Sequence, residues 1–358
     1  MSGFPLLIQV LRDPACALRL DVREWELVLR QALSANLSAS LQGILADSGH
    51  DAGLPAHVRR HLDWAAVQAR RHRQAVEWEI RQIDEALLKV DTPLVLLKGA
   101  AYTAAGLRAG RGRLFSDIDV LVTRSSLAEV ESALLLHGWN PARLDAYDQR
   151  YYRTWMHEIP PMVHTRRDTA IDVHHTILPL TARARPDPVK LLAAARPLGA
   201  QTRVRVLAPV DMLLHSATHL FYDGEFQHGL RDLLDIDRLV RECEPAPEFW
   251  TGIVARAQKL QLGRPLFYAL RYASWLLDTP VPADVRAHVK RMGPPAALLV
   301  LMDALFRRAL LPKHASCIGR LGELADLVLY VRGNWLRMPP LLLARHLFHK
   351  AFRAQPDK

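Results

Sequence analysis

The first 90 residues carry apolar positions at helical spacing. Between residues 56 and 90 no proline or glycine interrupts the chain, so the pattern predicts one long helix. Its apolar positions are Val58, Leu62, Ala65, Ala69, Val76 and Ile80. Upstream, Asp21 stands where it can cap a helix through VREWELVLRQAL. We therefore expect a helical region over residues 1–90.

After Pro93 the spacing between apolar residues shortens, and apolar runs bounded by turns predict strands. The first two, over 94–97 and 117–122, are separated by a Lys98-Gly99 turn, an alanine-rich helix over 100–107 and a glycine-containing loop. Ser125 is expected to cap the following helix, which ends at Gly138. Three further extended segments are predicted over 151–159, 162–166 and 170–177, with a hairpin turn at 167–169.

From Pro209 onward the spacing is helical again. Helices are predicted over 209–223, 226–243, 248–261, 266–277, 283–292 and 296–310, with prolines between several of them. The whole pattern predicts an α+β protein in three parts: an N-terminal helical region (1–90), an α/β core (91–207) and a C-terminal helical domain (208–358). After Pro340 an apolar and basic segment predicts an amphipathic helix, which either packs on the domain or touches a membrane surface.

Composition and charge narrow the functional classes. Half of the residues are hydrophobic, as in globular proteins, which argues against disorder. The net charge of +10 is compatible with nucleic acid, anionic lipid or nucleotide as a partner. The basic residues are dispersed and are not interleaved with aromatic residues, as a groove for single strands requires. Nucleic-acid binding is therefore compatible with the sequence but not favoured.

Cysteines and apolar run lengths bear on location. Cys16, Cys243 and Cys317 are far apart and odd in number, which predicts no disulfide framework and favours a reducing cytoplasm. No apolar stretch approaches the roughly 18 residues that a bilayer crossing needs. We predict a cytoplasmic protein without a transmembrane segment.

Three aspartates carry the strongest chemical signal. Asp117 and Asp119 are two residues apart on a predicted strand, so both carboxylates point to one side of it while Ile118 and Val120 pack inside. Paired carboxylates suit a hard cation such as Mg²⁺, which is commonly bound together with substrate phosphates. Asp172 follows the same alternation on a later strand, and an adjacent position in the sheet would bring it beside the pair. The three predict a metal site for phosphoryl or nucleotidyl transfer.

The Lys98-Gly99 turn precedes this strand and predicts contacts with phosphate. Gly99 allows a close backbone approach, and the helix that follows would attract an anion at its N-terminus. Lys98 either contacts a phosphate as a point charge or is a solvated surface residue. Arg113, four residues before Asp117, is placed to neutralise triphosphate charge.

Other polar residues are open to two interpretations. His174 is either near the metal or structural. His215 and His219 share a helix face with Asp211. They form either a metal pair or a buried polar network. The absence of a flanking glutamate favours the network. Arg231 lies on the next helix, from which it could reach the cleft on the acceptor side.

Several of these motifs together resemble a known family. They are Lys98-Gly99, Arg113, S-D-I-D-V-L-V over 116–122, I-D-V-H-H over 171–175, D-M-L-L-H-S-A-T-H over 211–219 and L-R-D-L-L-D-I-D over 230–237. They resemble the polymerase-beta-type nucleotidyltransferase superfamily, and more closely its bacterial "uncharacterised nucleotidyltransferase" family. The resemblance implies a mixed-sheet core and Mg²⁺ or Mn²⁺ bound by Asp117, Asp119 and Asp172. It also implies a nucleoside triphosphate such as ATP, contacted by Lys98, Gly99, Arg113 and Ser116.

The leading hypothesis is a metal-dependent enzyme that transfers a nucleoside monophosphate to an unknown acceptor. The acceptor group is a hydroxyl or phosphate of a small molecule, a protein or a peptide. Ala100 stands where the wider superfamily has serine, so the second hypothesis is a binding protein of the same fold without chemistry. A nucleic-acid-binding protein ranks third.

Overall fold

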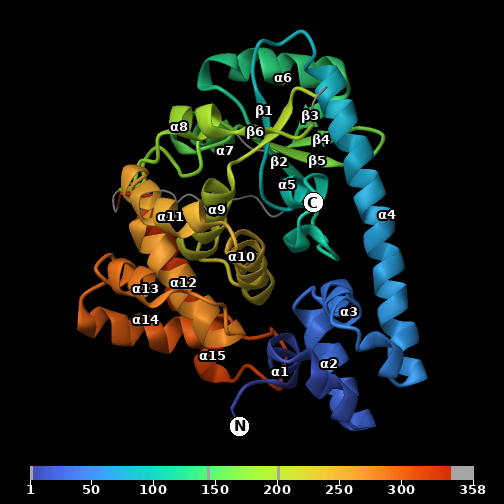
Figure 1. Cartoon of the computed structure of the whole chain (residues 1–358). Helices are drawn as coiled ribbons and strands as arrows, with labels where there is room; N and C mark the ends of the chain where they lie inside the picture. Colours follow the sequence, from blue (N-terminus) through green and yellow to red (C-terminus); the bar gives the residue numbers. More distant parts are fainter. Residues whose placement is uncertain (1–2, 143–145, 200–201, 340–358) are drawn as a thin grey trace.

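The computed structural model describes residues 3–142, 146–199 and 202–339, which are arranged as Figure 1 shows. A mixed β-sheet lies at one end of the molecule, and the helices of the C-terminal half lie below it in this view. The long helix α4 (Ala56–Ala86) runs along one side, between the N-terminal helices and the sheet. The predicted α+β class, a small mixed sheet flanked by helices on both sides in sequence, is confirmed.

The N-terminal region is helical, as its apolar spacing predicts. It contains α1 (Leu6–Arg12), α2 (Val22–Ser34), α3 (Ser38–Asp47) and α4, which is unbroken over 31 residues. The Asp21 carboxylate accepts a hydrogen bond from the Glu24 backbone N–H at 2.8 Å, and the Glu24 carboxylate accepts one from the Asp21 N–H at 2.9 Å. This reciprocal pair satisfies two free N–H groups at the start of α2, and it confirms the predicted cap.

Strands β2 and β5 lie side by side in the interior of the sheet. In the described residues its order is β3-β4-β5-β2-β1-β7-β6. β2 pairs in parallel with β5 and antiparallel with β1, so β2 and β5 both have neighbours on either side. The bounds are β1 (Leu94–Leu96), β2 (Asp117–Leu121), β3 (Trp139–Pro141), β4 (Met162–His164), β5 (Ala170–His174), β6 (Arg196–Pro197) and β7 (Val204–Val206).

The structure corrects the prediction for residues 151–159. Most of that segment belongs to a helix, α7 (Ala146–Trp155). Its aromatic residues favour a strand by composition, but Tyr147, Tyr151 and Trp155 are four apart, and their rings contact one another along one helix face. The hairpin between β4 and β5 is confirmed, and Asp168 occupies its left-handed turn position with φ of +52°.

Two smaller differences concern short elements. Ser125 does not cap α6 (Leu127–Leu136); its hydroxyl donates to Thr123 Oγ1, and a short 3₁₀ turn precedes the helix. Strands β3, β6 and β7 were not predicted, because they are short and, unlike the equally short β1, contain no continuous apolar run. β7 lies parallel to β1, and β6 pairs with the other edge of β7 and ends the sheet on that side.

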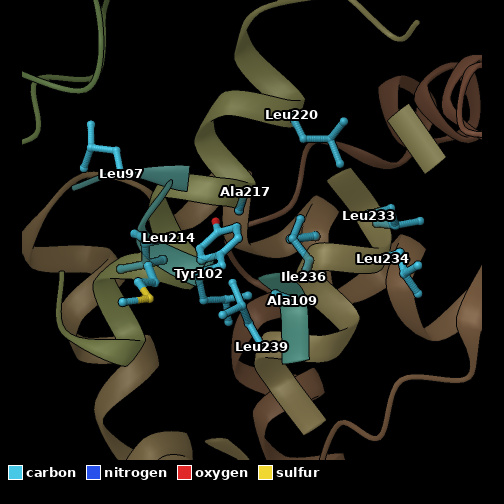
Figure 2. Packing of buried hydrophobic residues seen from close by; sticks show 14 of the residues in the cluster. Leu97, Tyr102, Ala109, Leu214, Ala217, Leu220, Leu233, Leu234, Ile236 and Leu239 are labelled. Atoms are coloured by element: carbon cyan, nitrogen blue, oxygen red, sulfur yellow. The ribbon is translucent and has the colours of Figure 1, made fainter. Parts of the chain in front are cut away.

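The C-terminal half is a stack of helices that covers the loop carrying Arg113. These helices are α9 (Pro209–Tyr222), α10 (Gly229–Cys243), α11 (Pro247–Lys259), α12 (Gly263–Leu277), α13 (Ala283–Lys290), α14 (Ala296–Ala309) and α15 (Arg320–Arg337), whereas α8 (Pro188–Ala194) precedes β6 and lies at the level of the sheet. Figure 2 shows Tyr102 of α5 (Lys98–Ala104) packed among Leu214, Ala217 and Ile236 of α9 and α10. The helices predicted from 209 to 310 are confirmed, and α15 was not predicted.

The structure addresses one of the two expectations about membranes. In the described ranges, no helix combines the length and apolar composition that crossing a bilayer requires. The amphipathic segment expected after Pro340 lies outside the described residues.

Gly112 joins the core to the N-terminal helices and provides a test of that contact. Its φ is +73°, and a Cβ there would lie 2.5 Å from the backbone of Ala39 and Ser40 at the start of α3. We expect Gly112→Ala to lower the free energy of unfolding by about 3 kcal/mol, from left-handed strain and backbone overlap. Gly43→Ala, in the interior of α3 with open space at the Cβ position, should instead raise it by roughly 0.5–1 kcal/mol. Urea unfolding measures the free energy of unfolding of both variants. Equal changes in the two variants would show that the backbone of α3 is not in close contact with the Gly112 loop.

Candidate active site

Three carboxylates meet across the β2–β5 pair. Asp119 is directly opposite Asp172 in the parallel register, and Asp117 is opposite Ala170. One oxygen from each of the three aspartates lies within 4.8 Å of the others. Asp119 is buried, whereas Asp117 and Asp172 are half-buried. The fold thus brings together the three residues that the sequence singled out, in a geometry that could hold a metal ion.

Two side-chain nitrogen atoms approach the same oxygen of Asp119. Lys98 Nζ donates to Asp119 Oδ1 at 2.9 Å, and His174 Nε2 lies 2.9 Å from that oxygen. Burial would raise the pKa of Asp119, but the charge of Lys98 and the hydrogen bond from His174 outweigh it and hold the pKa well below its usual range. Burial would also lower the pKa of Lys98, yet the Asp119 carboxylate raises it. Both groups are therefore charged at neutral pH.

The pKa of Asp172 shifts in the opposite direction to that of Asp119. Burial, followed by the charges of Glu158 and Asp119, raises the pKa of Asp172 to about 7. Carboxylates that share a site cannot all be ionised without a compensating cation. A divalent ion would supply that compensation and is expected to displace the proton. Ser116 Oγ donates to Asp117 Oδ1 at 3.1 Å and so fixes the third carboxylate.

The turn after β1 aims Lys98 at Asp119. Lys98 has φ of +44°, an uncommon conformation for a residue with a side chain and one that clusters at functional sites. Gly99 is required for a reason that the sequence did not reveal. A Cβ there would collide with the guanidinium of Arg113 and the ring of Phe115.

Arg113 lies in an internal ion pair rather than open toward a phosphate. Its Nε donates to Asp235 Oδ2 at 2.6 Å and its Nη2 to Asp232 Oδ1 at 3.5 Å. The side chain is 7% exposed and lies over the ring of Phe115. Burial lowers its pKa, but the two carboxylates more than reverse that effect. The guanidinium joins the core to α10, which differs from the triphosphate contact that the sequence predicted.

Arg231 and the α9 histidines belong to the same helical half. Arg231 Nη2 lies 2.8 Å from Asp232 Oδ1, so this arginine too is engaged within the protein. His215 is buried, and burial, followed by the charge of Lys98, lowers its pKa well below the usual value. His219 Nε2 lies 3.0 Å from Asp223 Oδ2. Among the described residues, His215 and His219 do not belong to a group that could hold a metal ion.

Three residues near the aspartates were missed by the sequence analysis. His157 and Glu158 precede β4, and Glu158 Oε2 lies 3.4 Å from His174 Nδ1. Asp223 ends α9, and its negative charge helps to raise the pKa of Lys98. The pair H-E before a strand and the spacing of His219 and Asp223 by four were the available signals.

Comparison with known proteins agrees with the geometry. A family model described as an uncharacterised nucleotidyltransferase matches residues 21–278, from the capping residue of α2 to the residue after α12. A comparison with curated proteins gave no match. The matched segment is most of the chain and includes Lys98, the three aspartates, α9 and α10. On this match over most of its length, the chain belongs to the family of uncharacterised nucleotidyltransferases.

Proposed function

We propose that the protein transfers a nucleoside monophosphate from a nucleoside triphosphate to an acceptor hydroxyl or phosphate. The proposal rests above all on the convergence of Asp117, Asp119 and Asp172, within 4.8 Å, on the interior strands of a nucleotidyltransferase-family core. These residues would hold Mg²⁺ or Mn²⁺, since three carboxylates form a hard, all-oxygen donor set. A divalent ion bound there would neutralise triphosphate charge and orient the attacking and leaving oxygens.

The protein's own groups have separate parts in this reaction. The acceptor oxygen forms a bond to the α-phosphorus, the bond to the β-phosphate oxygen breaks, and pyrophosphate leaves. Asp172, half-buried at the rim of the group, would accept the proton of an acceptor hydroxyl. Lys98 would orient Asp119 and stabilise the charge that develops on the phosphate oxygens. Most of the rate enhancement would come from positioning and electrostatics.

A binding protein of the same fold is the second candidate, and one observation favours it. Lys98 and His174 both contact Asp119 Oδ1, so this carboxylate is already paired within the protein and leaves a metal ion only its other oxygen unless Oδ1 is shared. Such a protein would bind the nucleotide without transferring it. We also propose a cytoplasmic location, which rests on the three separate cysteines, all present as free thiols.

Labelling with nucleotides tests the enzyme directly. The full-length protein is incubated with each α-labelled nucleoside triphosphate, Mg²⁺ or Mn²⁺, and an extract of host cells as the source of acceptors. We expect a labelled product and pyrophosphate release with the wild type and neither with Asp117→Asn. Binding of the metal–nucleotide complex by calorimetry without any label transfer would support the second candidate. Equal pyrophosphate release from wild type and variant would contradict the proposed site.

Lys98→Met separates the two proposed effects of the ammonium group. We expect kcat for nucleotidyl transfer to fall by roughly 10²–10³-fold, because a cation aimed at developing charge is lost. Mg²⁺ affinity, measured by calorimetry, should be equal or tighter, because the competitor for Asp119 is gone. If transfer is unchanged, Lys98 serves only to pair with Asp119.

A further inference from the structure

A second group of metal-binding side chains lies beside the aspartates. His157, Glu158 and His174 each offer one atom to a common point, with these atoms within 4.8 Å of one another. His174 belongs to β5, and the segment carrying the other two runs antiparallel to it. The Ile159 N–H donates to the Val173 carbonyl at 3.1 Å, and the His175 N–H donates to the His157 carbonyl at 2.8 Å. The backbone therefore fixes all three side chains on one scaffold.

The distances match those between ligands of a single small cation. Glu158 Oε2 lies 3.4 Å from His174 Nδ1 and 3.9 Å from His157 Nε2. Tetrahedral bonds of about 2.0–2.1 Å to Zn²⁺ place neighbouring ligand atoms roughly 3.4 Å apart. The exposed fractions of the His174, Glu158 and His157 side chains are 3%, 13% and 15%.

His174 Nδ1 points independently to a missing partner. The residue is 2% exposed, and in the described part of the chain this nitrogen makes no hydrogen bond. The other ring nitrogen must donate to Asp119, since an ionised carboxylate accepts only. Nδ1 lies 3.4 Å from the Glu158 carboxylate oxygen without forming a hydrogen bond to it. Burial of two facing acceptors is unfavourable unless a cation or a proton lies between them.

We propose that His157, Glu158 and His174 bind one transition-metal dication of the Zn²⁺ class. Two imidazole nitrogens and one carboxylate oxygen prefer such an ion, whereas the neighbouring three-carboxylate group prefers Mg²⁺. Three protein ligands leave a fourth position for water or a substrate atom.

The two groups are linked through one side chain. His174 would give Nδ1 to the transition metal while its Nε2–H binds Asp119 Oδ1. An ion on one nitrogen polarises the ring and strengthens the hydrogen bond from the other. The metal would therefore fix the direction of the Asp119 carboxylate. Binding of the ion itself does not depend on nucleotidyl transfer by the protein.

The test uses Co²⁺ and Zn²⁺ with the full-length protein after chelation of bound metals. We expect about one tightly bound Co²⁺ per chain, with the visible absorption of tetrahedral cobalt, which Zn²⁺ displaces and excess Mg²⁺ does not. His157→Gln and Glu158→Gln should each weaken Zn²⁺ binding at least about 100-fold in competition titrations. His175→Gln is the matched control and should bind as the wild type does.

Further variants tell the two sites apart. Asp117→Asn should keep the cobalt spectrum, even if it abolishes nucleotidyl transfer. Loss of the spectrum in Asp117→Asn but not in His157→Gln would place the ion on the aspartates and overturn the proposal. No Co²⁺ or Zn²⁺ binding by the wild type would show that His174 holds a proton instead, and would also overturn it. Zn²⁺ should raise the Tm of the wild type but not that of His157→Gln, which guards against a folding defect.

Discussion

Asp172→Asn is expected to lower nucleotidyl transfer at least about 10³-fold, because several kcal/mol of metal-derived stabilisation depend on its carboxylate. The same change should stabilise the metal-free protein at pH 8. The pKa of Asp172 in the folded protein is raised to about 7 by burial and by the charges of Glu158 and Asp119. Above that pH the folded protein must bury an ionised carboxylate that the unfolded chain leaves in water, and asparagine removes this cost.

The sign of the pH dependence makes the predicted stabilisation by Asp172→Asn specific. A raised pKa means that the protonated carboxyl contributes stability at low pH, which is lost as the pH rises through about 7. The stability advantage of Asp172→Asn should thus be largest at pH 8 and shrink toward pH 5. Chelator-treated samples, unfolded in urea at both pH values, measure it. Asp168→Asn, at the exposed hairpin turn where a left-handed asparagine is tolerated, should change neither activity nor stability. An active or destabilised Asp172→Asn variant would contradict the assignment.

Arg113→Ala is expected to destabilise the protein by about 3–5 kcal/mol, as removal of one partner from a buried ion pair does. The change leaves Asp235, 2.6 Å away in the wild type, buried without the guanidinium that it pairs with, and it removes the packing over Phe115. Arg111→Ala is the matched control two residues away. Its pair with Asp47 is more than half exposed on both sides, so the loss should stay below about 1 kcal/mol.

Arg113→Lys refines this test. It keeps the charge but loses the planar fork that reaches Asp235 and Asp232 together, so it should recover only part of the stability. Urea unfolding midpoints compare the three variants. If Arg113→Ala is no less stable than Arg111→Ala, then Arg113 is not a structural residue, and a role at the nucleotide regains support.

The sequence was informative where local patterning decides the structure. Alternation along β2 and β5 was enough to expect that Asp117, Asp119 and Asp172 face the same side, and the parallel register places 119 opposite 172. The helix over 56–86 and the helices after 209 carry strong periodicity, and the structure has them. The family motifs then supplied the nucleotidyltransferase core, which the match over residues 21–278 bears out.

Features made by distant contacts were not predictable in this way. The partner of Arg113 is 122 residues away on α10, so nothing near it in the sequence distinguishes a buried ion pair from a phosphate contact. Glu158 lies close to His174 because of a single isolated β-bridge between the two residues. The bridge follows helix α7, whose aromatic composition is typical of a strand. Its detection requires the tertiary structure.

The interior location of β2 and β5 has a consequence for how ions would enter and leave. Both strands are hydrogen-bonded on either side, so the backbone that carries the carboxylates is already rigid before any ligand arrives. The entropy of ordering this scaffold is lost during folding and not again on binding. Cations would then exchange with little rearrangement of the main chain, and occupancy would track the free ion concentration in the surrounding solution.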